Sequence, residues 1–340
     1  TTRAATVDLT AISNSISFYY LIISMPLGIL FNLLSIVLFR RPNLNKTNMG
    51  MLFTNLAVMD TISLLFYFFV QRPSVVFGYS VPMPCGVMSY LRRIIFNYCS
   101  WVQVMISADR FINIYFSIRF KFIRSKKFYY MLLGIVLVIV SIATSTNLLT
   151  TPSTTTTTTF SNATNRTTTR TTTSCTMTRE VSLVTDFLAI LLRVYLPLFS
   201  MLFFNFMIIK RLISSKNKVN QANKSSNKSS SSKEAKFTAL TILLDVIFWI
   251  FYAPVSVNLT LSIVDTFTEF IQPSQEAAYN LYANISQLIA ISYHASFFLI
   301  NIIFNKLFRT ELLVMLRLDR TFGNTRIEST ARTQMSINQN

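Results

Sequence analysis

Seven apolar segments, each about as long as a bilayer is deep, dominate this sequence. A helix needs roughly 20 mostly apolar residues to cross the hydrocarbon core of a membrane. Windows of that length give candidate spans at residues 16–39, 49–70, 87–118, 128–149, 181–209, 237–261 and 277–304. The sequence therefore predicts an all-α membrane protein, a bundle of seven transmembrane helices.

The composition supports the same class and argues against a soluble one. Hydrophobic residues make up 51% of the chain and charged residues 13%, and the mean hydropathy is +0.46. This leaves too little polar surface to solvate a globule of 340 residues. The net charge of +18 does not indicate nucleic-acid binding, because the cations lie between the apolar segments and not on a basic face with interleaved aromatic residues.

The distribution of cations predicts the orientation. If the N-terminus is outside, the inner segments hold 22 Lys and Arg residues and the outer segments hold seven. Cytoplasmic loops carry the excess of cations in membrane proteins. We therefore expect an extracellular tail at residues 1–15, a helical domain at 16–316 and a polar, disordered cytoplasmic tail at 317–340.

A cysteine and an Asp-Arg pair mark the two ends of the third span. Asp109 follows Cys85 by 24 positions, which is about 36 Å of helix, so the two residues should lie at opposite membrane faces. The inner end reads Asp109-Arg110-Phe111. It resembles the Asp-Arg-Tyr motif of rhodopsin-like G-protein-coupled receptors.

Other segments resemble the same family, most closely its neuropeptide branch, over roughly residues 16–316. The sixth span resembles the family's Phe-x-x-x-Trp-x-Pro motif through Phe248, Tyr252 and Pro254, and Pro197 matches a proline that supports a bulge in helix five. Residues 305–313 resemble the amphipathic helix eight. The seventh span departs from the family, because residues 297–304 contain neither the proline nor the tyrosine of Asn-Pro-x-x-Tyr.

The resemblance implies a receptor that binds an extracellular ligand and activates a heterotrimeric G protein through outward movement of helix six. In the resting state Arg110 would be held by Asp109 and Glu234. Glu234 precedes Pro254 by twenty residues, about 30 Å along the helix, which places it near Arg110. The alternative is that Asp109 and Arg110 merely cap a helix at the interface.

The second span contains Asn55-Leu-Ala-Val-Met-Asp60. A carboxylate near the membrane centre costs about 2.5–3.5 kcal/mol on insertion scales, so Asp60 should face the protein interior. The resemblance implies an allosteric sodium ion at Asp60, although Cys99 stands where the family has a serine. The alternative is a hydrogen-bonded or protonated Asp60, and no other cofactor is expected.

Cys85 and Cys175 both map to the outer side, where a disulfide persists, and we predict that they bond. Cys99 falls inside the membrane and is expected to be a buried apolar residue. The loop at 150–180 is rich in threonine and carries two glycosylation sequons, at Asn162 and Asn165.

The residues expected near the ligand suit a peptide. Arg92 stands where amine receptors of the family carry an aspartate, which disfavours a cationic amine, and the seventh span lacks the lysine that visual pigments need. The predicted ligand-binding residues are Arg92, Arg93, Phe96, Asp186, Arg193, Tyr252 and Glu276. The alternative for Arg92 and Arg93 is a pair that extends toward the membrane interface.

Two other classes fit less well. A transporter or channel would show interrupted helices in related halves, whereas the chain has six glycines and no visible internal repeat. An enzyme would need a nucleophile with a base or a metal set, and the sequence offers neither. We therefore expect a multi-pass receptor of the plasma membrane, whose tail is a substrate for kinases and a partner for arrestin.

Overall fold

The computed structural model describes residues 8–45, 47–116, 125–161, 166–221, 228–268, 270–272 and 274–316. Within these ranges, side chains are described except at 155–161, 166–174, 215–221 and 228–237.

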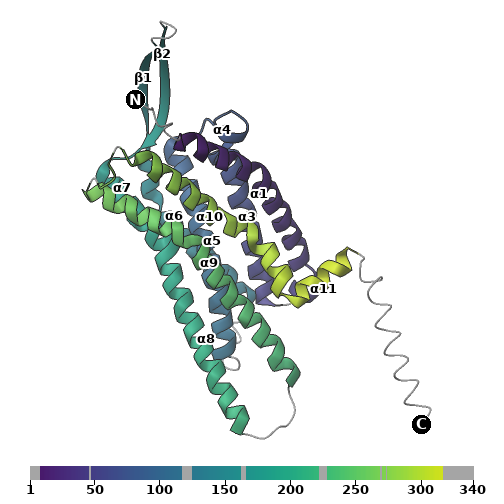
Figure 1. Ribbon diagram of the computed structural model, residues 1–340. Helices are drawn as coiled ribbons and strands as arrows, with labels where there is room; N and C mark the ends of the chain where they lie inside the picture. Colours follow the sequence, from purple (N-terminus) through teal and green to yellow (C-terminus); the bar gives the residue numbers. More distant parts are fainter. Residues whose placement is uncertain are drawn as a thin grey trace, which may run out of the picture.

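The described chain is a bundle of long helices with a β-hairpin at one end (Figure 1). We call this end of the bundle the hairpin end. The long helices are α1 (Leu9–Phe39), α3 (Asn48–Phe66), α5 (Cys85–Tyr115), α6 (Lys126–Ala143), α7 (Arg179–Ile190), α8 (Leu196–Gln221), α9 (Lys228–Thr268) and α10 (Glu276–Phe304). Short helices are α2 (Pro42–Asn45), α4 (Pro73–Val76) and α11 (Lys306–Met315), and π-helical turns at Tyr67–Gln71 and Leu191–Tyr195 extend α3 and join α7 to α8.

Six helical spans of the described chain are long and apolar enough to cross a membrane: Leu9–Phe39, Asn48–Gln71, Lys126–Leu149, Arg179–Ser214, Thr238–Thr268 and Glu276–Phe304. The seventh span is α5, which at 31 residues is long enough to cross a membrane but contains more polar and charged residues. Its polar side chains are sheltered because α5 packs against α3, α6, α8 and α9. The predicted all-α bundle of seven spans is confirmed.

Helix α1 begins at Leu9, seven residues before the predicted first span at residues 16–39. The Asp8 side chain caps α1 by accepting hydrogen bonds from the backbone amides of Thr10 and Ala11, as acidic residues commonly do at helix N-termini. The hydropathy window missed this start because a cap requires no apolar residue. At the other end of the chain, α11 ends at Met315, and the predicted tail at 317–340 lies outside the described residues.

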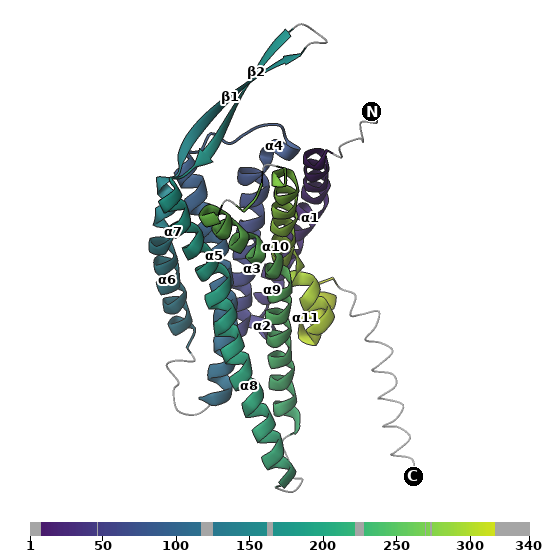
Figure 2. The same ribbon diagram turned by 60° about the vertical axis from the view of Figure 1, so that its left-hand side comes forward.

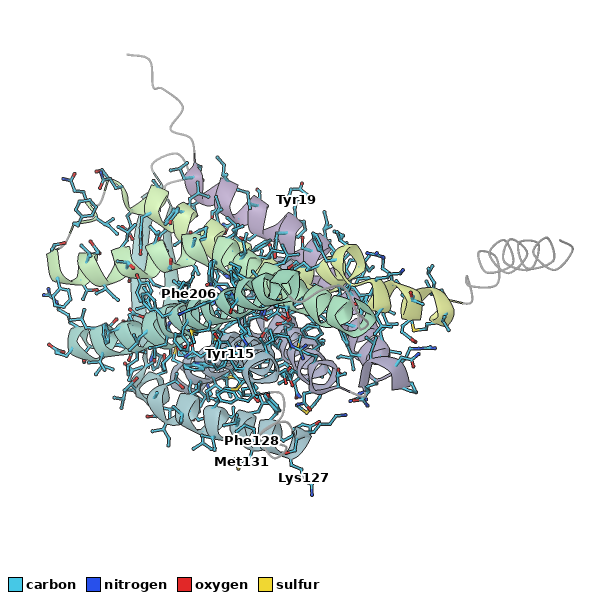
Figure 3. The ribbon with its side chains drawn as sticks, turned by 90° about the horizontal axis from the view of Figure 1, so that it is seen from below. Tyr19, Tyr115, Lys127, Phe128, Met131 and Phe206 are labelled. Atoms are coloured by element: carbon cyan, nitrogen blue, oxygen red, sulfur yellow. A yellow bond between two sulfur atoms is a disulfide. The ribbon has the colours of Figure 1, made fainter. Side chains whose placement is uncertain are left out.

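Apolar side chains cover the outside of the bundle. Tyr19 and Phe206 are each 65% exposed and Met131 is 49% exposed. Figure 3 shows Tyr19 and Met131 on opposite outer edges. A continuous apolar exterior of this kind is stable in lipid and not in water.

Close contact between α1 and α10 depends on a glycine. A Cβ atom added at Gly28 would lie 2.7 Å from the Cβ of Ala295, so a larger residue would push the two helices apart. Asn32, one helical turn after Gly28, donates a hydrogen bond of 2.8 Å to the carbonyl of His294. Small residues commonly allow membrane helices to approach in this way.

The threonine-rich loop forms the β-hairpin, a feature the sequence did not predict. Strands β1 (Thr151–Ser161) and β2 (Arg166–Thr176) pair antiparallel, from Thr151 opposite Thr176 to Ser161 opposite Arg166. Threonine is β-branched and favours strands. The hairpin projects away from the helices (Figure 2).

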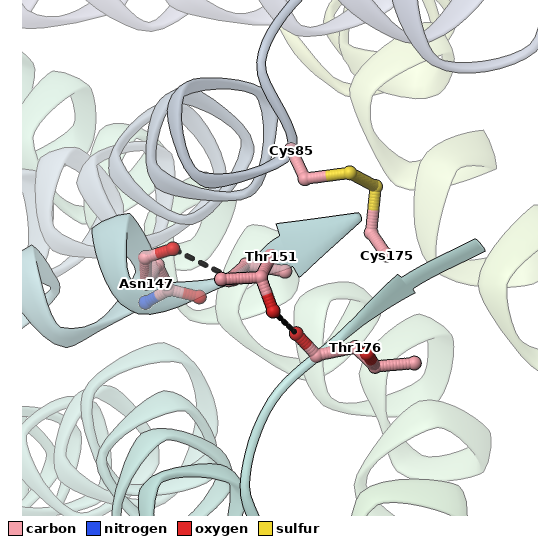
Figure 4. The surroundings of a disulfide bond; sticks show 6 residues. Cys85, Asn147, Thr151, Cys175 and Thr176 are labelled. Atoms are coloured by element: carbon pink, nitrogen blue, oxygen red, sulfur yellow. Dashed lines mark hydrogen bonds between the residues drawn. A yellow bond between two sulfur atoms is a disulfide. The ribbon is translucent and has the colours of Figure 1, made fainter. Parts of the chain in front are cut away.

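A disulfide ties the base of this hairpin to α5. Cys85, the first residue of α5, bonds Cys175, which lies opposite Pro152 in the hairpin. Figure 4 shows the bond beside the hydrogen bond from the Thr151 hydroxyl to the Thr176 carbonyl. The disulfide predicted from the two cysteines is thus present. The sequons at Asn162 and Asn165 lie outside the described residues.

Candidate functional site

One face of α5 carries a line of polar and aromatic contacts through the bundle. Residues 92, 96, 99, 103, 107 and 110 are spaced three or four positions apart, so they share a helix face. They contact three different groups of side chains, one near the hairpin end, one in the middle and one at the opposite end.

Near the hairpin end, Arg92 lies within electrostatic range of three other arginines and one carboxylate. Arg92 interacts electrostatically with Arg72, Arg93, Arg193 and Asp186. We call Arg72, Arg92, Arg93 and Arg193 the arginine cluster. The Arg93 guanidinium donates to the Asp186 carboxylate at 2.6 Å, and Arg72 donates to the side-chain oxygen of Asn284 at 3.4 Å.

Arg193 lies within a π-helical turn and is buried. Pro197 has no amide hydrogen and cannot complete the regular helix, and the turn at Leu191–Tyr195 lies directly before it. The predicted bulge at Pro197 is therefore observed. The Arg193 side chain is buried, with its guanidinium carbon 4.8 Å from the centre of the Phe96 ring and 5.3 Å from that of Tyr252.

Of the seven predicted ligand-binding residues, six lie in or directly beside this group. Asp186 pairs with Arg93, and the rings of Phe96 and Tyr252 pack against the Arg193 guanidinium. Glu276 is different. It is exposed in the first turn of α10, and no hydrogen bond or ion pair joins it to the arginines among the described residues.

Tyr252 links the arginine cluster to the middle of the bundle. Its ring stacks on Phe248 with centroids 4.2 Å apart, and its hydroxyl lies 3.1 Å from Nε2 of His294. Nδ1 of His294 lies 2.6 Å from the Asp60 carboxylate. A neutral imidazole satisfies both partners, donating to Asp60 and accepting from Tyr252. This chain of contacts joins α9, α10 and α3.

The same region contains the donor set for the predicted sodium ion. Ligand atoms of Asp60, Cys99 and His294 lie within 4.8 Å of one another and are all buried. Hard cations take oxygen ligands, whereas imidazole nitrogen and sulfur suit softer metals. Cys99 also contacts the Ser63 hydroxyl at 3.2 Å. The sodium ion stays a prediction that this donor set disfavours, and it plays no part in the proposed mechanism.

Asp245 on α9 is the centre of a second buried network. Its carboxylate accepts hydrogen bonds from Gln103 at 2.8 Å, Ser107 at 2.7 Å and Asn205 at 2.8 Å. Gln103 and Ser107 belong to α5 and Asn205 to α8. The network therefore ties α9 to both helices. The helical period predicts that Asp245 faces inward, but its partners could not be found from the sequence.

The Asp109-Arg110 pair lies at the end of the bundle opposite the hairpin. Arg110 donates to Asp109 through Nη2 at 2.5 Å and through Nε at 3.2 Å, and the Asp109 side chain is fully buried. Asn48 donates to the other oxygen of Asp109 at 3.4 Å. Glu234 falls within α9, but its side chain lies outside the described residues, so its contact with Arg110 stays a prediction.

Helix α11 is anchored to the α1–α2 corner by a buried acid. Glu311 accepts hydrogen bonds from Asn43 and Arg41, both at 2.5 Å. The hydrogen bond from Asn43 and the charge of Arg41 lower the pKa of Glu311 from its ordinary value of 4.5. The sequence indicated the amphipathic helix, but it gave no signal for this anchor.

These features together define the class of the protein. Seven helical spans, a disulfide-tied loop at one end, an Asp-Arg pair at the other and a short helix after the last span are the arrangement of a G-protein-coupled receptor. The family model described as "Serpentine type 7TM GPCR chemoreceptor Srx" matches residues 22–272. The chain belongs to this chemoreceptor family. Among curated proteins no match was found.

Proposed function

We propose that this chemoreceptor lies in the plasma membrane with its hairpin end outside, binds a peptide there and activates a heterotrimeric G protein on the inner side. The observation that carries the proposal is that α9 makes two separate inward contacts: Tyr252 lies against the Arg193 guanidinium, and Asp245, seven residues earlier on the same helix, bonds α5 and α8. Both contacts hold the same helix in place. A change near Arg193 can therefore alter the position of α9 relative to α5 and α8.

The proposed mechanism is a shift between two packings of α9. A ligand that draws the Arg193 guanidinium away from the Tyr252 ring removes the contact that holds this part of α9 inward. Outward movement of α9 then breaks the bonds between Asp245 and its partners on α5 and α8. The ligand must bind the outward state more tightly than the resting state for this shift to occur.

Opening at the opposite end would expose Arg110. In the described structure this arginine is paired with Asp109 and its side chain is 12% exposed. The predicted topology places 22 cations in the inner segments, which gives a basic surface suited to the acidic groups of a G protein. The resting contact between Arg110 and Glu234 belongs to the same proposal.

A peptide suits the hairpin end because charges of both signs are present. The arginine cluster offers partners for carboxylates, while the exposed Glu276 offers a partner for an ammonium group. Phosphorylation of the tail by kinases and binding of arrestin complete the proposal, and their acceptor residues lie outside the described residues.

The test is ligand-dependent nucleotide exchange in membranes from receptor-expressing cells, with purified G-protein heterotrimers of each subtype and a library of short peptides. We expect at least one peptide to accelerate exchange, and we expect an Arg110→Ala receptor with equal surface expression to bind that peptide without accelerating exchange. Absence of exchange with every subtype, together with solute flux in proteoliposomes, would overturn the proposal in favour of a transporter.

A further inference from the structure

The arginine cluster carries more positive charge than its partner Asp186 balances. Arg72, Arg93 and Arg193 lie close enough to Arg92 to act on its charge, and so does the carboxylate of Asp186. Asp186 already bonds Arg93. Since guanidinium groups stay charged in proteins, the single carboxylate of Asp186 cannot balance four arginines.

Several hydrogen-bond donors of this cluster have no partner. Nε and Nη2 of Arg193 and Nε of Arg93 are buried without a hydrogen-bond acceptor among the described residues. Arg193 is 6% exposed, so these donors cannot be satisfied by bulk water. Unpaired buried charge is strongly unfavourable, and an anion at this position would remove the penalty.

The geometry also makes Arg193 a suitable anchor. The rings of Phe96 and Tyr252 hold its guanidinium in place, and a planar guanidinium binds carboxylate, sulfate or phosphate oxygens through two parallel hydrogen bonds.

We infer that the arginine cluster binds an oxoanion of the receptor's ligand, a carboxylate, sulfate or phosphate group, with Arg193 as the central contact. This inference rests on the proposed function, because it identifies the chemistry by which the ligand reaches Tyr252 and α9. The oxoanion belongs either to a small organic acid or to the free C-terminus of a peptide.

The first test is thermal unfolding of the purified full-length receptor in an uncharged maltoside detergent, which supplies no lipid phosphate. The probes are succinate, inorganic phosphate and sulfate, compared with chloride at equal ionic strength, and tetrapeptides with a free or an amidated C-terminus. At saturating concentrations we expect an oxoanion to raise Tm by about 2–4 °C. Protection by succinate, phosphate or sulfate indicates a small acid, and protection by free but not amidated peptides indicates a peptide.

Matched variants assign the effect to the cluster. Arg193→Gln should abolish the Tm increase, while Arg179→Gln, which alters an exposed arginine at the hairpin end outside the cluster, should retain it. Arg92→Gln serves the same purpose if Arg193→Gln does not fold. Asp186→Asn removes the competing carboxylate and should lower the concentration needed for half-maximal protection by about tenfold.

The inference is overturned if none of these probes raises Tm, or if Arg193→Gln shows the same Tm increase as the unmodified receptor and Arg179→Gln. Its failure is distinguishable from failure of the proposed function. A ligand without an oxoanion that accelerates nucleotide exchange would refute the anion site alone, whereas protection by an oxoanion in a receptor that never accelerates exchange would refute G-protein activation alone.

Discussion

Replacement of Asp245 by alanine tests whether the buried network holds the resting state. The carboxylate accepts three hydrogen bonds, from Gln103, Ser107 and Asn205, and is fully buried. All three donors lie on α5 or α8, so outward movement of α9 must break the bonds. Asp245→Ala removes these hydrogen bonds from the resting state. It does not change the energy of the outward state, in which the bonds are already broken, so the equilibrium shifts toward the outward state.

The magnitude follows from the number of bonds. Hydrogen bonds between membrane helices contribute about 0.6 kcal/mol each, which gives about 2 kcal/mol for the network. This energy changes an equilibrium constant roughly 30-fold. If about 1% of resting receptors are in the active packing, about a quarter would be active in the variant.

The assay is ligand-free nucleotide exchange, measured at equal surface expression. Asp8→Ala is the control, because it removes the cap of α1 and destabilises the fold by about 1 kcal/mol without touching α9. We expect a marked increase in ligand-free exchange for Asp245→Ala and none for Asp8→Ala. Ligand-free exchange in Asp245→Ala at or below that of the unmodified receptor would refute the reasoning.

Three further predictions address the other contacts. Glu234→Ala should raise ligand-free exchange if Glu234 restrains Arg110, and unchanged exchange would count against that restraint. Cys85→Ser should lower the free energy of unfolding by about 2–4 kcal/mol, seen as a lower Tm than for the unmodified receptor under non-reducing conditions, with equal Tm values after reduction. Because the folded pKa of Glu311 is depressed, its contribution to stability is present above its ordinary pKa of 4.5 and is lost as the pH falls through the folded value. Glu311→Gln should remove this acid dependence of Tm, and an unaltered pH profile would contradict the assignment.

The sequence predicted the bundle because a membrane leaves few choices. A segment in hydrocarbon must satisfy its backbone hydrogen bonds internally, so hydropathy alone predicts the helices, whereas the orientation that positive charge predicts stays a prediction. The disulfide could be predicted for a similar reason. Cys99 falls inside a span, which leaves Cys85 and Cys175 together on one side of the membrane.

The structure corrected the sequence where polar residues decide the local fold. Helix α1 starts at its Asp8 cap, earlier than the apolar window predicted, and the threonine-rich segment forms a β-hairpin where a loop was expected. Neither signal is apolar, so a hydropathy window misses both.

What the sequence determined by itself is the number of spans, their approximate positions along the chain and the helix face that each side chain occupies. Only the tertiary structure decided that Asp245 bonds α5 and α8, that His294 joins Tyr252 to Asp60 and that Glu311 anchors α11. The helical period shows which face of its own helix a side chain occupies, because that depends only on nearby positions in the sequence. Its partner is set by the packing of helices far apart in the chain, where a buried polar group bonds whichever complementary group comes within reach.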